Sequence, residues 1–362
     1  MNKLEILFVH LGKSDSKHLI RNINLLHENF PQTPINCIVS KQSHLLKNMP
    51  TFVKISIYEP SSEINDVLNL KSIDQKFRNG FWRYSLERLI AVESLHVKNK
   101  NQAYLHVESD VLLLPHFPLQ KFSELKHVCW LPVTPAYDIA SLVYFPKYES
   151  TKEFKRDLLN YVKKSNEPTD MKGLSYLRHK FPDKYKTLPI SHPSLPKLNK
   201  IELDTSLESK VDFGGIFDAS NIGMWLTGID PANTYGFLEL FNTKKILIGN
   251  SYTDPSIYAI KFHEKIGLYF ENSNEKIIIF NLHIHSKSLR IFSNNWRNEI
   301  THLTRLSHKA KIYRVFYPKI LLGLLRDNFK NGTFLMFLYN SPIMSKVRRL
   351  KTFLNGRTKI LE

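Results

Sequence analysis

Two acidic side chains follow an apolar segment of the chain. The run Tyr104–Val107 precedes Glu108, Ser109 and Asp110, and the apolar residues 111–114 come directly after them. Residues i and i+2 of an extended strand point the same way, so both carboxylates are expected on one side. Charged side chains are rarely buried unless they are paired or bind a metal. The pattern predicts a Mg²⁺ or Mn²⁺ site for substrate phosphates, and the alternative is a pair of solvated turn residues.

Two histidines end a second apolar segment. The β-branched run 277–285 predicts a strand, and His283 and His285 stand at i and i+2 near its end. Neutral imidazole is a good ligand for divalent transition metals, including Mn²⁺. Lys287, just past the strand, is suited to neutralising a phosphate. The alternative is one buried structural histidine and one exposed histidine.

Arginines surround a glycine turn before a predicted helix. Gly80 suits the turn, and Arg78, Arg83 and Arg88 lie around it. Guanidinium groups bind phosphates in a bidentate manner, so these residues are candidates for a nucleotide site. Arg83 and Arg88 are five residues apart and need not share a helix face. The alternative is a helix with solvated arginines.

A glycine-rich stretch supplies two further acids. Residues 212–231 contain four glycines together with Asp218 and Asp230. Glycines let the backbone approach a ligand closely, and either aspartate could orient an acceptor hydroxyl or act as a general base. The glycine spacing matches neither a Walker loop nor a dinucleotide fingerprint. A series of structural turns is the alternative.

The elements that must position these residues alternate in type along the chain. Strands separated by helices of this length predict an α/β fold with a doubly wound, mostly parallel sheet, which binds ligands at the carboxyl ends of its strands. Residues 166–197 are rich in Pro, Ser and Lys and are expected to form a long variable loop. The predicted strands are 4–10, 35–39, 52–58, 104–107, 127–133 and 277–285. The predicted helices are 16–29, 82–97, 151–164, 235–242, 294–307 and 313–329.

The composition is that of a globular and strongly basic chain. It has 362 residues, 42% of them hydrophobic, and a formal net charge of +18. Residues 305–362 hold 13 Lys and Arg against two Asp and Glu, so most of the basicity lies in this tail. Its interleaved aromatic residues predict a basic helical extension on an anionic membrane surface, or else a helical cap. The two cysteines form no disulfide framework, and neither a signal peptide nor a transmembrane helix is expected.

Several of these segments occur in an order that resembles a known family. Residues 81–85, 106–112, 217–219, 222–223, 228–231 and 282–287 resemble, in this order, the GT-A class of nucleotide-sugar glycosyltransferases. Within this class, the segments resemble those of bacterial capsule and surface-polysaccharide enzymes. The resemblance covers roughly residues 4 to 290. It implies a GT-A-like (Rossmann-like) catalytic domain over 1–300, with a nucleotide-sugar half at about 1–135, an acceptor half at about 136–300 and a basic extension over 301–362.

The resemblance also implies roles for individual residues. Asp110 would hold a divalent metal, Mn²⁺ or Mg²⁺, on the donor diphosphate, and Glu108 would contact the metal or the ribose. The family usually has Asp at the first of these positions, where this chain has Glu108. His285, or in second place His283, would complete the metal shell. The residues implied to bind the nucleotide-sugar are Arg83, Arg88, Glu108, Asp110 and Lys287, and the candidate catalytic acids are Asp218 and Asp230.

The implied activity is transfer of a sugar, a hexose first, from a nucleoside-diphosphate sugar to a glycan or lipid-linked acceptor. A UDP-sugar is the first donor to expect, the pathway would be capsule or lipopolysaccharide synthesis, and the stereochemistry is left open. The enzyme would be cytoplasmic and peripheral on the inner face of the membrane. The alternatives are a metal-dependent phosphohydrolase or nuclease, a polyanion-binding protein and an inactive glycosyltransferase-like scaffold. No nucleic-acid-binding motif occurs, so no specific nucleic acid is expected as a partner.

Overall fold

The computed structural model describes most of the chain up to residue 312. The described residues are 4–12, 17–77, 80–195, 204–227, 252, 255, 259–272, 275–286 and 288–312. The predicted helices at 235–242 and 313–329, together with Arg78, Asp230 and Lys287, lie outside them. No helix within the described ranges is both long and apolar enough to cross a lipid bilayer.

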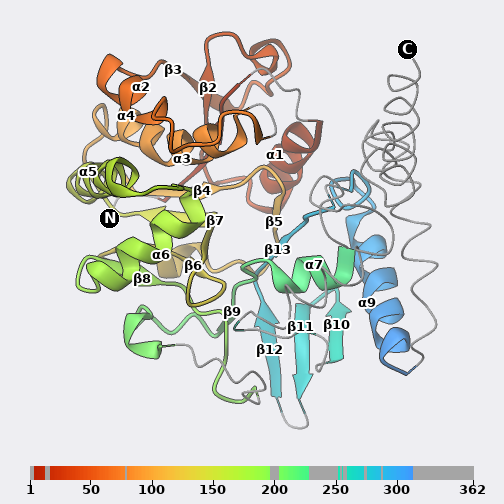
Figure 1. Cartoon of the computed structure of the whole chain (residues 1–362). Coiled ribbons are helices and arrows are strands. Elements are labelled where there is room, and N and C mark those ends of the chain that lie inside the picture. The colour runs from red at the N-terminus through yellow and green to blue at the C-terminus, as the bar shows by residue number, and fades with distance from the viewer. Residues whose placement is uncertain are drawn as a thin grey trace, which may run out of the picture.

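A seven-stranded sheet forms the centre of the molecule (Figure 1). Its strand order is β3-β2-β1-β4-β7-β6-β8. Neighbouring strands run parallel except for the pairs β4–β7 and β6–β7, which are antiparallel. The predicted α/β architecture with a mostly parallel sheet is therefore confirmed. The strands are β1 (Glu5–His10), β2 (Ile35–Ser40), β3 (Val53–Tyr58), β4 (Tyr104–Val107), β6 (Val128–Pro132), β7 (Asp138–Phe145) and β8 (Tyr185–Thr187).

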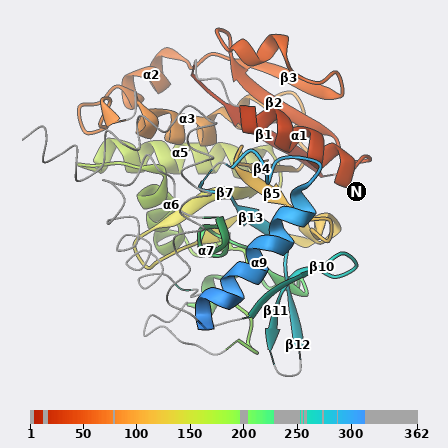
Figure 2. The same ribbon diagram turned by 90° about the vertical axis from the view of Figure 1, so that its right-hand side faces the viewer.

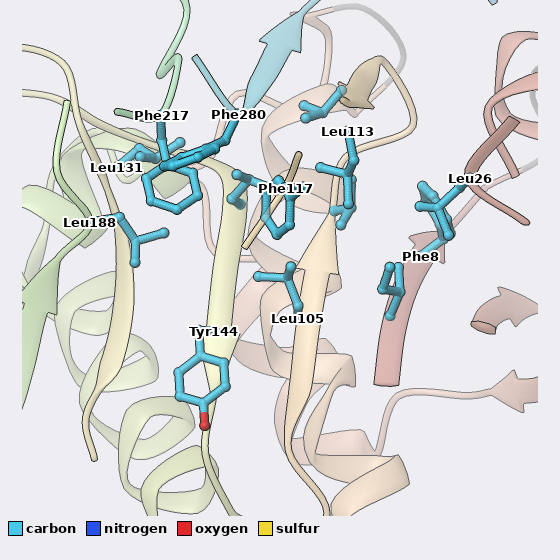
Figure 3. Packing of buried hydrophobic residues seen from close by; sticks show 14 of the residues in the cluster. Phe8, Leu26, Leu105, Leu113, Phe117, Leu131, Tyr144, Leu188, Phe217 and Phe280 are labelled. Atoms are coloured by element: carbon cyan, nitrogen blue, oxygen red, sulfur yellow. The ribbon is translucent and has the colours of Figure 1, made fainter. Parts of the chain in front are cut away.

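Helices cover both faces of this sheet (Figure 2). Leu19, Ile23 and Leu26 of α1 pack against one face in a cluster that includes Phe8 and Leu105, part of which Figure 3 shows. The opposite face is covered mainly by α3, α5 and α6, whose apolar residues recur at helical spacing. The helices are α1 (Lys17–Asn29), α2 (Ser62–Leu68), α3 (Phe81–Ala91), α4 (Glu93–His96), α5 (Tyr148–Lys164), α6 (Asp170–Lys180), α7 (Asn221–Thr227) and α9 (Trp296–Ile312).

The order of the first strands creates a switch point in the sheet. The chain adds β2 and then β3 on one side of β1, whereas β4 pairs with the other side of β1. Connections therefore leave the carboxyl ends of β1 and β4 in opposite directions, which opens a crevice in which α/β proteins bind ligands. The acidic residues of the sequence analysis follow β4 and so lie at this switch point.

The late part of the chain forms a smaller sheet and a two-stranded ribbon. The small sheet has the order β10-β11-β12-β9 and packs with α7 and α9 around a separate apolar cluster. The ribbon pairs β13 with β5 of the first half in antiparallel fashion. Its strands are β5 (Val111–Leu113) and β13 (Asn281–His283), and the small sheet has β9 (Gly215–Ile216), β10 (Ala259–His263), β11 (Gly267–Asn272) and β12 (Glu275–Ile279).

Two sequence expectations for the second half are wrong. The predicted single strand 277–285 is divided at Phe280, because the Phe280 N–H donates to Ile216 O while its carbonyl accepts from Leu114 N–H. The predicted loop over residues 166–197 contains α6 and β8. Thr169 caps α6 by accepting from Lys172 N–H at 3.2 Å, and the helix packs its apolar residues against the main sheet. The prediction also lacks the strands β5, β7, β9, β10 and β11 and the helices α2 and α7.

Candidate active site

A tight turn brings the two acids of the sequence analysis together. Glu108 and Asp110 lie between β4 and β5, where Val111 N–H donates to Glu108 O at 3.0 Å. The Glu108 N–H donates to Ser141 O of β7, also at 3.0 Å, and this bond fixes the start of the turn on the sheet. The carboxylates of Glu108 and Asp110 lie close together as predicted, but a tight turn places them there and not an extended strand.

His283 completes the group from the other half of the chain. Strands β13 and β5 lie side by side (Figure 1), and their register places His283 opposite Val111, which directly follows Asp110. Its Nε2 atom lies 3.4 Å from a carboxylate oxygen of Glu108 and 3.5 Å from one of Asp110. One ligand atom from each of these three residues lies within 4.8 Å of the others.

The ring of His283 is held in one orientation. Its Nδ1 atom lies 3.0 Å from Ala219 O, and because a carbonyl only accepts, Nδ1 carries the proton and Nε2 faces the acids. Burial by itself lowers the pKa of His283, but the carboxylates of Asp110 and Glu108 together outweigh this effect. The pKa is therefore raised, to about 9. In the absence of a bound cation, the imidazolium itself therefore neutralises part of the acidic turn.

His285 has a different place from the one that the resemblance implies. Its ring stacks on that of His283, with the ring centroids 4.0 Å apart and the planes at 23°. Among the described residues, the group of candidate metal ligands contains His283 and not His285. The geometry thus favours His283 over His285 as the candidate ligand, and it gives His285 a packing contact with the His283 ring.

Of the candidate arginines, Arg83 and Arg88 lie within the described residues, and one of these two reaches the acidic turn. Arg88 of α3 contacts the carboxylate of Glu108 and donates from Nη2 to Asp170 Oδ2 at 2.8 Å. Arg83 is bonded instead to Asn65 of α2 at 2.7 Å, and it also contacts the Asn69 side chain and Glu87. Arg88 is therefore positioned to orient Glu108, whereas Arg83 joins α3 to α2.

Asp170 is a member of this site that the sequence analysis missed. It is the first residue of α6 and lies 82 positions after Arg88, within the segment expected to be a loop. Burial lowers the pKa of Arg88, but Glu108 and then Asp170 outweigh this effect and raise it. Thr169 followed by Asp170 is typical of a helix start, so the sequence could have predicted α6. It could not have predicted that Asp170 pairs with Arg88.

Asp218 lies behind His283, with its carboxylate occupied by backbone groups. One oxygen accepts from Ile222 N–H at 2.9 Å, and the other accepts from Gly223 N–H at 2.7 Å and from His283 N–H at 3.0 Å. The side chain of Asn281 pairs with both the N–H and the carbonyl of Asp218. Burial raises the pKa of Asp218 in spite of these bonds. This geometry favours a positioning role over proton abstraction from an acceptor.

The donor set of Glu108, Asp110 and His283 fits a divalent cation. Two carboxylates and one imidazole suit Mn²⁺, and ligand atoms about 2.1 Å from one ion lie about 3 Å apart. The separations of 3.4 and 3.5 Å between His283 Nε2 and the two carboxylates require only a small approach, and the ligand atoms of all three residues lie within 4.8 Å of one another. The hydrogen bond from Nδ1 to Ala219 O is the outer-shell contact that a metal-binding histidine normally has.

No protein-family model and no curated protein sequence matches the chain. Solved structures with partial similarity include the galactosyltransferase LgtC in complex with donor and acceptor sugar analogs (12% identity, TM-score 0.38, 51% of this chain and 73% of that chain). The PaToxG glycosyltransferase aligns with 12% identity and a TM-score of 0.30, over 50% of this chain and 70% of its own. Mouse xyloside xylosyltransferase 1, in its apo form, aligns with 7% identity and a TM-score of 0.32, over 52% and 85%.

Proposed function

We propose that this protein is a metal-assisted glycosyltransferase that moves a sugar from a nucleoside-diphosphate donor to an acceptor hydroxyl. The observation that carries the proposal is the convergence of Glu108, Asp110 and His283 at the switch point between β1 and β4. Ligands bind in α/β sheets at this point, and a carboxylate–histidine group there suits a cation on a diphosphate. The ordered motifs that resemble GT-A glycosyltransferases support the same assignment.

Each described residue of the candidate site has a role in the proposed sugar transfer. Asp110 and His283 would hold the cation together with Glu108, whose carboxylate Arg88 orients. When bound, such a cation would supply positive charge to stabilise the negative charge that develops on a leaving diphosphate. Asp218 keeps the His283 backbone in register and is proposed to position this ligand.

Three residues keep roles that follow from the resemblance alone. Lys287 is proposed to contact the donor phosphates and Asp230 to serve as the base for the acceptor hydroxyl. Arg83 stays a proposed nucleotide-sugar residue that would act through its contacts with α2. An inverting enzyme needs such a base, whereas a retaining one does not need it in the same way.

The biological setting is proposed in the same terms. The donor is a UDP-hexose, and the acceptor is a glycan or a lipid-linked glycan of surface polysaccharide synthesis, in the capsule or in lipopolysaccharide. The basic tail 305–362 would hold the enzyme at the inner face of the cytoplasmic membrane, where lipid-linked acceptors are exposed. A lipid-linked acceptor and a basic surface tail are mutually consistent.

A ligand screen by thermal shift tests the proposal directly. UDP, GDP, CDP and CMP are each added with and without Mn²⁺ to the wild type, to Asp110→Asn and to Glu124→Gln. Glu124 lies in an exposed ion pair with Lys121 and serves as the matched control. A ligand that binds only the folded state raises the melting temperature, by an amount that corresponds to about 2.7 kcal/mol at a hundredfold excess over Kd.

We expect a Mn²⁺-dependent shift with one nucleotide, which Asp110→Asn loses and Glu124→Gln retains. Incubating the matching sugar nucleotide with glycan acceptors should then yield a glycosylated product. Absence of any nucleotide-dependent shift would contradict the proposal in favour of a polyanion binder or an inactive scaffold. Release of inorganic phosphate without sugar transfer would instead identify a phosphohydrolase.

A further inference from the structure

Asn22 of α1 lies behind the acidic turn, fully buried on a helix that contributes no ligand to the site. Its Nδ2 group donates to Ser109 O at 3.2 Å and to Val111 O at 2.7 Å. These two carbonyls flank Asp110 on either side. Both hydrogens of one amide therefore fix the backbone that carries the central candidate ligand.

The same face of α1 contacts the turn a second time. His18 lies one helical turn before Asn22, and its Nε2 atom is 3.0 Å from the Ser109 hydroxyl. Farther along the helix, Leu25 packs in the cluster that contains Leu112. Helix α1 thus contacts the backbone of the turn through Asn22 and the Ser109 side chain through His18. It also packs near β5, the strand that follows the turn, through Leu25.

The backbone of Asp110 is fixed from the opposite side as well. Its carbonyl accepts from Ile284 N–H at 2.8 Å, and Ile284 directly follows the proposed ligand His283. The turn is therefore held between α1 and β13, with the Asn22 amide on one side and the His283 strand on the other.

Burial of an amide at position 22 is costly for the fold. Among the described residues, no donor reaches the Asn22 Oδ1 atom, although the atom is buried. A leucine of similar volume would remove this unsatisfied oxygen, but it would also leave the carbonyls of Ser109 and Val111 without their Nδ2 donor. An amide at this position is explained by what its Nδ2 group does for the turn.

We infer that Asn22 is a positioning residue that sets the geometry of Asp110 for metal binding. The inference rests on the proposed metal site and adds a residue from outside it. A side chain that supports a ligand from behind typically contributes tenfold to a hundredfold, in order of magnitude, to metal affinity. A residue with a merely structural role would lower thermal stability and leave the metal affinity of the folded protein unchanged.

The test compares Asn22→Leu with Asn36→Leu in the full chain. Asn36 is a buried asparagine of β2 that donates to Glu5 at 2.7 Å, away from the turn, and Glu5 keeps its contact with Lys54 when Asn36 is replaced. Mn²⁺ affinity is measured by electron paramagnetic resonance of the free ion, without substrate. We expect Asn22→Leu to weaken binding about tenfold or more and Asn36→Leu to leave it unchanged.

Hydrogen exchange supplies a readout that does not depend on the metal. The amides of Val111 and Ile284 bond to Glu108 O and Asp110 O, so their exchange reports the order of the turn. Both should exchange faster in Asn22→Leu and at the wild-type rate in Asn36→Leu. If Asn22→Leu does not fold, Asn22→Ser, which is too short to reach both carbonyls, carries the same expectation.

The outcomes separate this inference from the proposed function. Wild-type exchange together with wild-type Mn²⁺ affinity in Asn22→Leu would overturn the inference and leave the metal site standing. Equal losses in Asn22→Leu and Asn36→Leu would also overturn it, because the effect would then be a general one on stability. Failure of the wild type to bind Mn²⁺ would contradict the metal site, and hydrogen exchange would still decide the role of Asn22.

Discussion

The carboxylate of Asp218 could act as a base or as a support for His283, and its hydrogen bonds favour the second role. It accepts three backbone N–H groups, one of them from His283 itself. Replacement by asparagine puts an NH₂ group against these N–H groups. We expect Asp218→Asn to lower the free energy of unfolding by about 1–3 kcal/mol and to weaken Mn²⁺ binding.

Urea unfolding and a Mn²⁺ titration of Asp218→Asn measure the two effects. A catalytic base would give the opposite pattern, with stability and metal affinity unchanged and kcat strongly reduced. The distinction matters for the proposed mechanism, because loss of Asp218 as a base leaves Asp230 as the remaining candidate among the acids of this glycine-rich stretch.

His96 is a buried histidine whose protonation should affect stability below neutral pH. Burial lowers its pKa to about 4, although the ring donates to Gln102 O at 2.7 Å. The unfolded chain takes up this proton near pH 6.5, so stability falls as the pH drops from there towards 4. Between pH 6.5 and 5 the loss from this residue is about 2 kcal/mol.

Urea unfolding of the wild type and of His96→Gln at these two pH values measures the contribution of His96. The glutamine does not titrate, so the variant should lose about 2 kcal/mol less than the wild type over this interval. The same loss in both proteins would show that other groups account for the acid sensitivity.

The contact between α7 and β13 depends on a glycine. A Cβ atom at Gly223 would lie 2.0 Å from His283 O, so that even alanine forces the helix away from the strand. Gly223→Ala should therefore cost about 1–3 kcal/mol or more and displace His283 from the acids, with a loss of Mn²⁺ affinity.

Gly173→Ala in α6 is the matched control for Gly223→Ala. Its new Cβ would meet side-chain atoms of Leu158 and Tyr161, which can shift, and no backbone atom. Alanine also favours the helix by up to about 1 kcal/mol. Mn²⁺ affinity should thus fall in Gly223→Ala only, and equal affinity in both variants would contradict the argument that α7 positions His283.

Elements with a clear local signal were predictable from the sequence. Strand β4 has its predicted bounds at Tyr104–Val107, because apolar residues end abruptly at an acid there. The break at Phe280 was not predictable, since Ile216 and Leu114, which impose it, are far away in the sequence. Local periodicity contains no information on such partners.

The same reasoning applies to the candidate site. The acids and the histidine pair could be proposed as candidates because each stands at the end of an apolar run. The choice of His283 over His285 depends on the register of β13 against β5. The pairing of Arg88 with Asp170 depends on the docking of α6, which no local pattern indicates. The candidate residues could therefore be identified from the sequence, whereas their partners in the folded protein could not.

The proposed site exists only when both halves of the chain are folded together. Its acids follow β4 of the main sheet, whereas His283 belongs to a strand that continues from the smaller sheet. Metal binding should thus stabilise the joint between the two sheets, because a cation that binds only the folded state favours that state by mass action. The β13–β5 ribbon would therefore link the fold to the proposed activity.

The positive charge of the chain is concentrated near its C-terminal end. Residues 313–362 hold ten Lys and Arg against two Asp and Glu, whereas α9 ends at Ile312. Each basic residue near an anionic bilayer contributes about 1 kcal/mol at most, and the effect is screened by salt. We expect the full chain to co-sediment with vesicles that contain anionic lipid, and a chain ending at Ile312 to bind them far more weakly.

Vesicles of neutral lipid and a series of salt concentrations are the controls for this experiment. Binding by charge should disappear on neutral vesicles and decline steeply as salt is raised. Equal binding of both chains to anionic vesicles would place the membrane contact elsewhere or remove it altogether. Mn²⁺ affinity should be the same in both chains, because Glu108, Asp110 and His283 all precede the deleted segment and the α9 packing is kept.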